Sequence, residues 1–447
     1  MNESKSSGFN AFIEKRLMPV AARLGQFKPL IAIRDGITLA MPLIIIGSIF
    51  LILGSFPIQA WTDWVANTSI DNVSIAAIFN KIVNGSFGIL GLIGCFGIAS
   101  SYAEQHHTDG KSAGVIALAS FFVVTPSIMS GDKAPLEGMP YGYLGSKGLF
   151  IAIIIGLIAG GIFQWFINHN IEIKMPDTVP PAVAKSFSAL IPGAVIITLF
   201  GAVYALFTWT GLGNIHDLLM HIFAKPFGVL SDTLGGTVLS IVLVSSFWFV
   251  GIHGANVVNS VISPLWLMNS DANRVLFKAG HLDLQHGGHI ISQGFIDNFV
   301  YMGGGGATLG LVLAIGVLVV MKRSSKQLEL LAPLTITPGL FNINEPAMFG
   351  LPVVLNTTIL IPFILAPVIN AVTTYFAMKT GIVPLATGAL VPWTMPPVIS
   401  GFLATNSWTG SALQLVNVLL DIAIYFPFLM AVNRQQVREE AGETTTE

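Results

Sequence analysis

Long runs of apolar residues recur along the chain and are separated by short polar segments. A helix needs about 20 apolar residues to cross the hydrocarbon core of a bilayer, which is about 30 Å thick. Residues 149–168, LFIAIIIGLIAGGIFQWFIN, form such a run. The pattern predicts transmembrane helices near residues 36–56, 85–102, 112–129, 149–168, 192–212, 236–252, 304–321, 351–376 and 411–431.

Basic residues indicate how these helices are oriented. Five of them precede the first predicted helix, namely Lys15, Arg16, Arg23, Lys28 and Arg34. Cytoplasmic segments carry an excess of Lys and Arg, so the N-terminus is predicted to be cytoplasmic. Arg434 and Arg438 favour the same side for the C-terminal tail, and so does the basic loop KRSSK, residues 322–326.

This orientation requires one more crossing between residues 253 and 304, which makes about ten. The best candidate is GANVVNSVISPLWLM, residues 254–268. It is short for a crossing, and Gly254 and Pro264 are expected to break or kink it.

Two further apolar segments are too rich in Pro, Gly, Thr and Asn for a regular transmembrane helix. They are LAPLTITPGLFNINEPAMFGLP, residues 331–352, and VPLATGALVPWTMPPVISG, residues 383–401. Irregular backbone is tolerated at membrane depth only where protein covers it or a water-filled cavity borders it. Both segments are therefore predicted to be re-entrant hairpins. Broken segments mark the place where a transporter binds its cargo.

The predicted fold is an all-α polytopic membrane protein with two functional bodies. The expected divisions are an amphipathic cytoplasmic segment (1–30), a transmembrane dimerisation domain (31–212), an amphipathic linker (213–235), a transport domain with the hairpins (236–432) and a cytoplasmic tail (433–447). Gly156 and Gly160 form a GxxxG pattern, which permits dimerisation or close packing inside one chain.

Composition agrees with the membrane assignment and excludes several functions. Of 447 residues, 53% are hydrophobic and 10% are charged, and soluble proteins have about 25% charged residues. The net charge of −2 argues against nucleic-acid binding. The single cysteine, Cys95, cannot form an internal disulfide or a CxxC site. His286 and His289 lack a third ligand nearby, and GxxxxGK[ST] is absent, so we expect neither metal nor cofactor.

Glu345 lies in the first predicted hairpin, beside Asn344. An ionised carboxylate in a membrane costs several kcal/mol unless it faces a cavity or finds partners. A structural alternative is a buried acid that accepts hydrogen bonds from the N–H groups at a helix end. His253, in GIHGAN, follows an apolar run, and Asn256 lies close to it in the sequence.

Trp248 and Trp393 complete the candidate site, together with Asn298 in FIDNFVYMGGGG. A flat aromatic ring can stack on the apolar face of a sugar while polar groups bind its hydroxyls. Either tryptophan taken alone is more typical of packing or of an interfacial position. One acid, one histidine, several amides and two tryptophans suit a polyhydroxylated, uncharged ligand.

Five motifs carry a family resemblance. In order they are KMPDTVPPAVAKSFSALIPG (174–193), GIHGAN (251–256), FIDNFVYMGGGGATLGL (295–311), FNINEPAMFGLP (341–352) and PWTMPP (392–397). Together they resemble Enzyme IIC, the membrane component of the bacterial phosphoenolpyruvate-dependent sugar phosphotransferase system, in its lactose, cellobiose and diacetylchitobiose group. The resemblance extends from about residue 10 to residue 435.

The resemblance implies a homodimer in the bacterial cell membrane. It implies that the N-terminal halves form the dimer contact and that the C-terminal half carries a disaccharide. The 6-hydroxyl of the sugar would then be phosphorylated by phosphocysteine on a separate Enzyme IIB. By the family pattern, Glu345 and His253 contact the sugar at the reacting hydroxyl, and a carboxylate there can accept the hydroxyl proton. The expected substrate-binding residues are Trp248, His253, Asn256, Asn298, Asn344, Glu345 and Trp393.

Two other functions are weighed against this one. A proton-coupled sugar symporter would use Glu345 and His253 as a proton relay. An intramembrane hydrolase is disfavoured because HExxH, GxSxG and paired intramembrane aspartates are absent. Cellobiose, diacetylchitobiose and lactose remain open as the sugar.

Overall fold

The computed structural model describes residues 19, 23–24, 26–128, 138–176, 178–219, 222, 228, 231–249, 253–351 and 356–441. Within these residues the strands are β1 (Ser69–Ile70) and β2 (Val73–Ser74), an antiparallel pair, and the other elements are helices. The helical stretches long and apolar enough to cross a membrane are Lys28–Gly54, Ile75–Glu104, Ser146–Asn168, Pro181–Thr210, Thr358–Lys379 and Trp408–Glu440. Shorter apolar helices span Gly110–Val124, Leu234–Phe249 and Leu309–Val320. The protein is therefore an all-helical polytopic membrane protein, as predicted.

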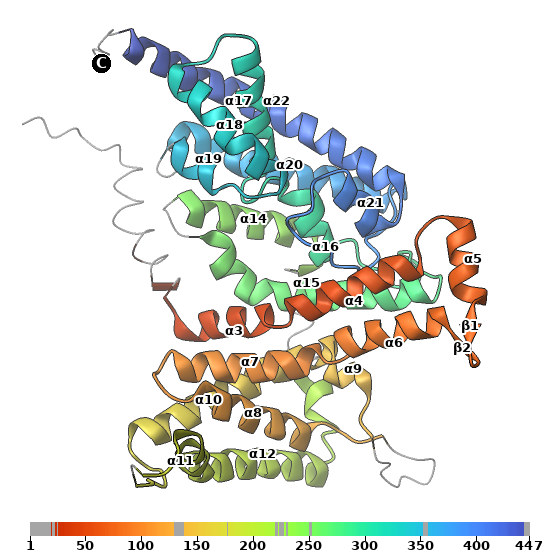
Figure 1. Ribbon diagram of the computed structural model, residues 1–447, viewed down its shortest axis with the longest axis vertical. Coiled ribbons are helices and arrows are strands. Elements are labelled where there is room, and N and C mark those ends of the chain that lie inside the picture. The colour runs from red at the N-terminus through yellow and green to blue at the C-terminus, as the bar shows by residue number, and fades with distance from the viewer. Residues whose placement is uncertain are drawn as a thin grey trace, which may run out of the picture.

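The first half of the chain forms a bundle of mostly regular helices (Figure 1). Its elements are α3 (Lys28–Thr38), α4 (Met41–Gly54), α5 (Gln59–Asn67), α6 (Ile75–Phe87), α7 (Leu90–Glu104), α8 (Gly110–Val124), α9 (Tyr141–Leu144), η2 (Ser146–Gly148), α10 (Leu149–Asn168), α11 (Pro181–Ser188) and α12 (Leu190–Thr210). Helix α7 packs against α3, α8 and α10. A Cβ atom on Gly156 would lie 2.8 Å from Cβ of Ile98 on α7, so the GxxxG pattern serves close packing inside this chain.

The second half contains shorter and more interrupted elements. They are α14 (Leu234–Phe249), α15 (Gly254–Lys278), α16 (Gln293–Phe295), the π-helical turn η3 (Ile296–Val300), α17 (Leu309–Val320), α18 (Lys326–Leu340), α19 (Glu345–Gly350), α20 (Thr357–Lys379), α21 (Ile399–Thr405) and α22 (Trp408–Glu440). Helices α17 and α20 pack on α22, and α14 packs on α20.

The element predicted at 254–268 is longer than expected. Helix α15 has 25 residues and continues through Pro264 without ending there. At about 1.5 Å per residue this length is enough to cross a bilayer. The last helix, α22, likewise continues to Glu440, beyond the predicted end at residue 431.

The first predicted hairpin is more regular than its sequence indicates. The expectation that residues 331–340 are irregular is wrong, because α18 continues through Pro333 and Pro338 to Leu340. This helix packs on α17, and tertiary packing of this kind overrides the low helix propensity of proline. Between α18 and α19 the break comprises residues 341–344, where Asn342 has a φ of 62°, and residue 352 of the predicted hairpin lies outside the described residues. In the second segment, residues 383–398 form no regular helix or strand.

Three hydrophobic clusters show how the halves meet. One lies within the first bundle and includes Cys95 and Phe200, and another lies in the second half and includes Trp248 and Leu429. The third joins Ile33 of α3 and other residues of α3 and α4 to Leu267 of α15 and to Ala389 and Leu390. Helices α3 and α4 therefore form the wall on which the second half rests.

Candidate functional site

His253 begins α15 and contacts the end of the preceding helix. Its Nδ1 atom accepts a hydrogen bond from the backbone N–H of Asn256 at 3.4 Å, so the side chain caps the helix. The imidazole lies against the ring of Trp248, with 4.4 Å between the ring centroids. Trp248 is only 7% exposed. A Cβ atom on Gly305 would lie 2.8 Å from Nε1 of this tryptophan, so only glycine fits beside it.

The glycine loop, residues 303–306, is held by two asparagines of the 341–344 break. The N–H of Gly303 donates to Oδ1 of Asn342 at 2.6 Å, and Nδ2 of Asn344 donates to the carbonyl of Gly305 at 3.0 Å. Nδ2 of Asn342 also donates to the carbonyl of Trp393 at 2.5 Å. Asn342 therefore joins both irregular segments to the glycine loop.

Glu345 is the first residue of α19, and it is exposed. A carboxylate at a helix N-terminus is favoured by the helix dipole. Glu345 and His253 lie close enough to interact electrostatically. The structure therefore brings together an acid and a histidine that come from two separate breaks of the chain.

A row of buried polar side chains supports the irregular backbone at residues 298–306. Gln414 donates to the carbonyl of Asn298 at 2.7 Å, and the Tyr425 hydroxyl donates to the carbonyl of Gly306 at 2.7 Å. Asn417 and Asn370 donate to the carbonyls of Phe299 and Val300, each at 3.4 Å. These bonds satisfy carbonyls that no helix pairs, a condition for irregular backbone at membrane depth.

A cavity of about 320 Å³ lies between the two halves. Ligand pockets of drug-sized molecules begin at roughly 300 Å³. Polar residues line it from α3, from α15, from α16 and from the second irregular segment: Arg34, Thr38, Asn256, Asn259, Ser260, Ser263, Gln293 and Trp393.

The predicted site residues fall into three groups, of which the first, Trp248, His253 and Glu345, is not among the residues that line the cavity. Asn256 and Trp393 line the cavity, and Trp393 is 53% exposed. Asn298 and Asn344 are buried, and their amide nitrogens donate to the backbone carbonyls of Gly294 and Gly305. Contact of the predicted residues with a sugar stays a prediction.

Sequence reasoning missed two residues at this site. Asn342 lies in the motif FNINEPAMFGLP but was given no role, because the carbonyl of Trp393 that its amide binds lies 51 positions further along the chain. Sequence reasoning counted Arg34 among the cytoplasmic charges, whereas Arg34 lines the cavity from within the continuous helical stretch Lys28–Gly54. A positive charge in a sequence does not distinguish a membrane surface from a cavity wall.

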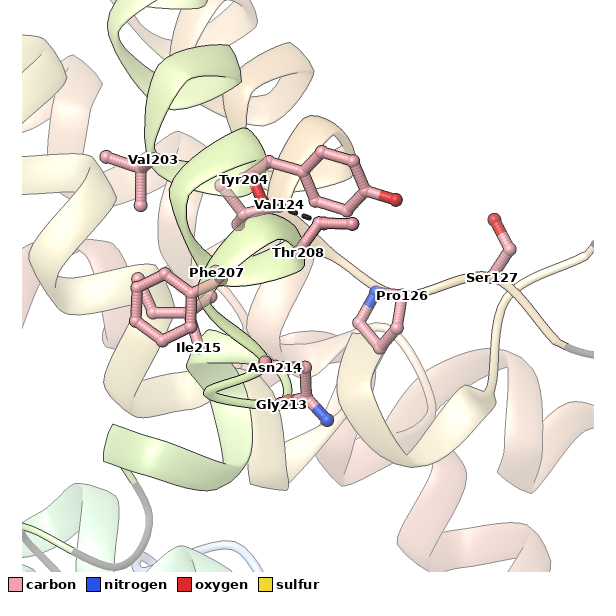
Figure 2. Close-up of a pocket in the computed structure, with 11 residues that line it drawn as sticks. Val124, Pro126, Ser127, Val203, Tyr204, Phe207, Thr208, Gly213, Asn214 and Ile215 are labelled. Atoms are coloured by element: carbon pink, nitrogen blue, oxygen red, sulfur yellow. Dashed lines mark hydrogen bonds between the residues drawn. The ribbon is translucent and has the colours of Figure 1, made fainter.

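A second cavity, of about 450 Å³, lies in the first bundle. Figure 2 shows Tyr204 and Thr208 facing Pro126 and Ser127. Its described polar lining groups are hydroxyls and one amide, and the cavity lies within residues 124–215, away from the interrupted segments that contain His253 and Glu345. The polar cavity beside His253 is the better candidate site.

A polar cavity among interrupted helices, inside an all-helical polytopic membrane protein, defines a membrane permease. The family profile described as "Phosphotransferase system, EIIC" matches residues 34–367, and the chain belongs to this family. It is therefore a sugar permease of the bacterial cell membrane, of the lactose, cellobiose and chitobiose group that the motifs predict.

Similar proteins support this assignment over nearly the full length. The chain is 42% identical to the "Putative permease IIC component YwbA" of Bacillus subtilis (strain 168), with 98% of each chain covered. It is 41% identical to the "PTS system cellobiose-specific EIIC component" of Geobacillus stearothermophilus, covering 98% of this chain and 97% of that one. The fold also matches the crystal structure of the transporter ChbC, the IIC component from the N,N'-diacetylchitobiose-specific phosphotransferase system. The TM-score is 0.89 at 40% sequence identity, and the match covers 97% of this chain and 100% of that one.

Proposed function

We propose that this permease carries a β-linked disaccharide of the cellobiose, diacetylchitobiose or lactose type and presents its 6-hydroxyl for phosphorylation by a separate Enzyme IIB. Similar proteins are named for such sugars, including the cellobiose-specific component and ChbC. The cavity has the size that a disaccharide requires, and apart from Arg34 its polar lining consists of uncharged groups, mostly amides and hydroxyls.

In the proposed reaction the sugar oxygen attacks the phosphorus of phosphocysteine. The bond between oxygen and phosphorus forms, the bond between phosphorus and sulfur breaks, and the thiolate remains on Enzyme IIB. Glu345 accepts the hydroxyl proton, and His253 holds the reacting hydroxyl in line. Asn256 and Trp393 bind the rest of the sugar, and Trp248 fixes the imidazole of His253 through their ring contact.

One observation carries this proposal: separate breaks of the chain converge at one place. His253, Glu345 and Trp393 come from three interrupted segments, yet His253 interacts electrostatically with Glu345. Asn342 links the segment of Glu345 to the carbonyl of Trp393. Such an arrangement is costly to build from irregular backbone, and a ligand site is the ordinary reason for it.

The assembly that we propose follows the family resemblance. Two copies associate through residues 31–212, both termini are cytoplasmic, and each protomer has about ten crossings and two re-entrant hairpins. The transport domain, residues 236–432, moves against residues 31–212 during transport. Cysteine pairs that bridge the two regions should then block uptake, and uptake at the parent rate in the cross-linked protein would contradict this movement.

The replacement Glu345→Gln tests the chemistry directly. Glutamine keeps the shape and still binds a hydroxyl, but it cannot accept a proton. We expect sugar affinity to fall modestly and formation of sugar phosphate to fall about 10²-fold or more. The measurements are a sugar titration on purified protein and sugar phosphate formed in vesicles supplied with phosphorylated Enzyme IIB. Phosphorylation at the parent rate would show that Glu345 binds the sugar but does not accept the hydroxyl proton.

The alternative function is proton-coupled symport through Glu345 and His253. Uptake in vesicles without a proton gradient separates the two functions. Symport stops under these conditions, whereas group translocation continues with phosphorylated Enzyme IIB and releases sugar phosphate inside.

A further inference from the structure

Arg34 is the one charged residue among the described residues that line the cavity. The other polar lining groups are hydroxyls, amides and the indole of Trp393. A neutral disaccharide does not need a cation to bind it. The cavity therefore carries a group that the binding of a neutral sugar alone does not explain.

The guanidinium is held in a fixed orientation. Its Nε and Nη2 atoms donate to Oδ1 of Asp35 at 2.8 and 2.6 Å. The other oxygen of this carboxylate, Oδ2, accepts a hydrogen bond from the Ser101 hydroxyl of α7 at 3.1 Å. An arginine has further N–H donors, and no other part of the described chain accepts a hydrogen bond from them. Arg34 is thus a positioned donor with remaining capacity for a ligand.

Arg34 also lies at the reacting end of the proposed site. Helices α3 and α15 lie side by side (Figure 1), and the guanidinium is close enough to His253 for electrostatic interaction. Asn256, one turn after His253, lines the same cavity as Arg34. The positive charge therefore lies near the place where the sugar hydroxyl meets phosphorus.

We propose that Arg34 binds the phosphoryl group as it passes from phosphocysteine to the sugar, and then the phosphate of the product. This inference rests on the proposed function. During the transfer negative charge spreads over the oxygens of the phosphoryl group, and arginine binds such oxygens with charge-assisted, often bidentate hydrogen bonds. Arg34 belongs to the first half of the chain, whereas Glu345 and His253 belong to the second. The site for phosphoryl transfer is therefore complete only when the two halves meet as they do in this structure.

The test separates binding of a neutral sugar from transfer of a charged group. Cellobiose, diacetylchitobiose and lactose are titrated onto purified Arg34→Gln, and the 6-phosphate of the sugar that binds is titrated as well. Formation of sugar phosphate is measured in vesicles with phosphorylated Enzyme IIB. We expect affinity for the neutral sugar to stay within about 3-fold and transfer to fall about 10²-fold, the loss typical of one stabilising donor. Affinity for the 6-phosphate should fall about 10-fold.

The matched control is Lys28→Gln, which removes a cation from the same helix. Lys28 donates to the carbonyl of Gln105 and does not line the cavity, so parent behaviour is expected. Arg34→Lys keeps the charge without the bidentate geometry and should retain at least about 10-fold more transfer than Arg34→Gln. The ratio of neutral-sugar to 6-phosphate affinity does not depend on the folded fraction, so it remains informative if a variant folds poorly.

Three outcomes decide the matter. If the parent forms no sugar phosphate, the proposed function fails. If the parent forms it and Arg34→Gln transfers at the parent rate, only the role of Arg34 is lost. An equal loss of neutral-sugar affinity and of transfer would make Arg34 a ligand for sugar hydroxyls and would also overturn the proposal.

Discussion

Some buried hydroxyls and amides find their hydrogen-bond partners differently in the two halves of the molecule. In the first half, Ser48, Ser120 and Thr125 donate to carbonyls four residues earlier in their own helices, at 2.8, 2.9 and 2.7 Å. In the second half, Gln414 and Tyr425 donate to carbonyls more than 100 positions earlier in the chain. The first pattern adds little to a helix whose backbone is already paired. The second supplies partners that the backbone lacks.

This difference explains why the irregular backbone of the candidate site belongs to the second half. A regular helix uses its own N–H and C=O groups, so it offers a ligand only its side chains. A broken segment frees backbone groups and turns side chains toward a cavity, but it needs substitutes for the bonds it has lost. The first bundle has the rigidity to serve as a support, and the second half has the exposed polar groups that a sugar requires.

The largest expected effect comes from Gln414→Leu. The Gln414 side chain donates to the carbonyl of Asn298 and to Ser400, and it accepts from the N–H groups of Val398 and Gly401. Each buried group left unpaired costs about 1–3 kcal/mol, so we expect a loss of about 3 kcal/mol or more. Thermal unfolding in detergent measures it, and sugar binding should weaken in the same variant.

Ser120→Ala is the control for this experiment. It also removes a buried hydrogen bond, but the carbonyl of Ile116 keeps its place in a regular helix. We expect a change of about 0.5 kcal/mol or less. Equal losses in the two variants would remove the distinction between the halves.

The next effect concerns His216, which follows α12 in the connecting segment. It is 1% exposed, and burial lowers its pKa from 6.5 to about 4. The unfolded chain therefore binds a proton that the folded chain does not, and stability falls as the pH is lowered from about 6.5 to 4. The loss should reach about 3 kcal/mol at the acidic end.

The variant His216→Gln cannot titrate in this range. We expect its thermal midpoint to depend less on pH between 6.5 and 4 than that of the parent protein. Parallel pH profiles for the two proteins would show that His216 does not contribute to acid sensitivity.

The smallest expected effect is that of Trp393→Ala on sugar binding. Loss of an aromatic contact with a sugar costs roughly 1 kcal/mol, or about 5-fold in affinity. Trp165→Ala on α10 is the comparison, because Trp165 is similarly exposed, at 47% against 53%, and lies outside the cavity. Unchanged affinity in a well-folded Trp393→Ala protein would show that Trp393 packs in the protein and does not bind the sugar.

How far the sequence predicts this structure also differs between the halves. The helix expected at 149–168 has the same bounds in the structure, because its apolar run is long and contains no proline. The break expected from residue 331 begins only at residue 341. Proline and glycine indicate where a helix can end, but contact with α17 decides where it does end.

Functional residues could be predicted from the sequence where a residue type is rare in membrane-spanning segments and has few roles there. An acid beside Asn344 in an apolar segment indicated a site at Glu345, and its contact with a sugar stays a prediction. Arg34 and Asn342 were not identified, because their meaning depends on partners distant in the sequence. The amide of Asn342 becomes informative only beside Trp393, and the guanidinium of Arg34 only beside the cavity.

The row of polar side chains on α22 has a consequence for biosynthesis. Residues 298–306 leave the ribosome more than 100 positions before Gln414 and Tyr425, which pair their carbonyls. Until the last helix is inserted, these carbonyls have only water or translocation machinery as partners. A chain that stops before α22 therefore lacks the side chains that pair these carbonyls, and insertion of the final helix completes their hydrogen bonding.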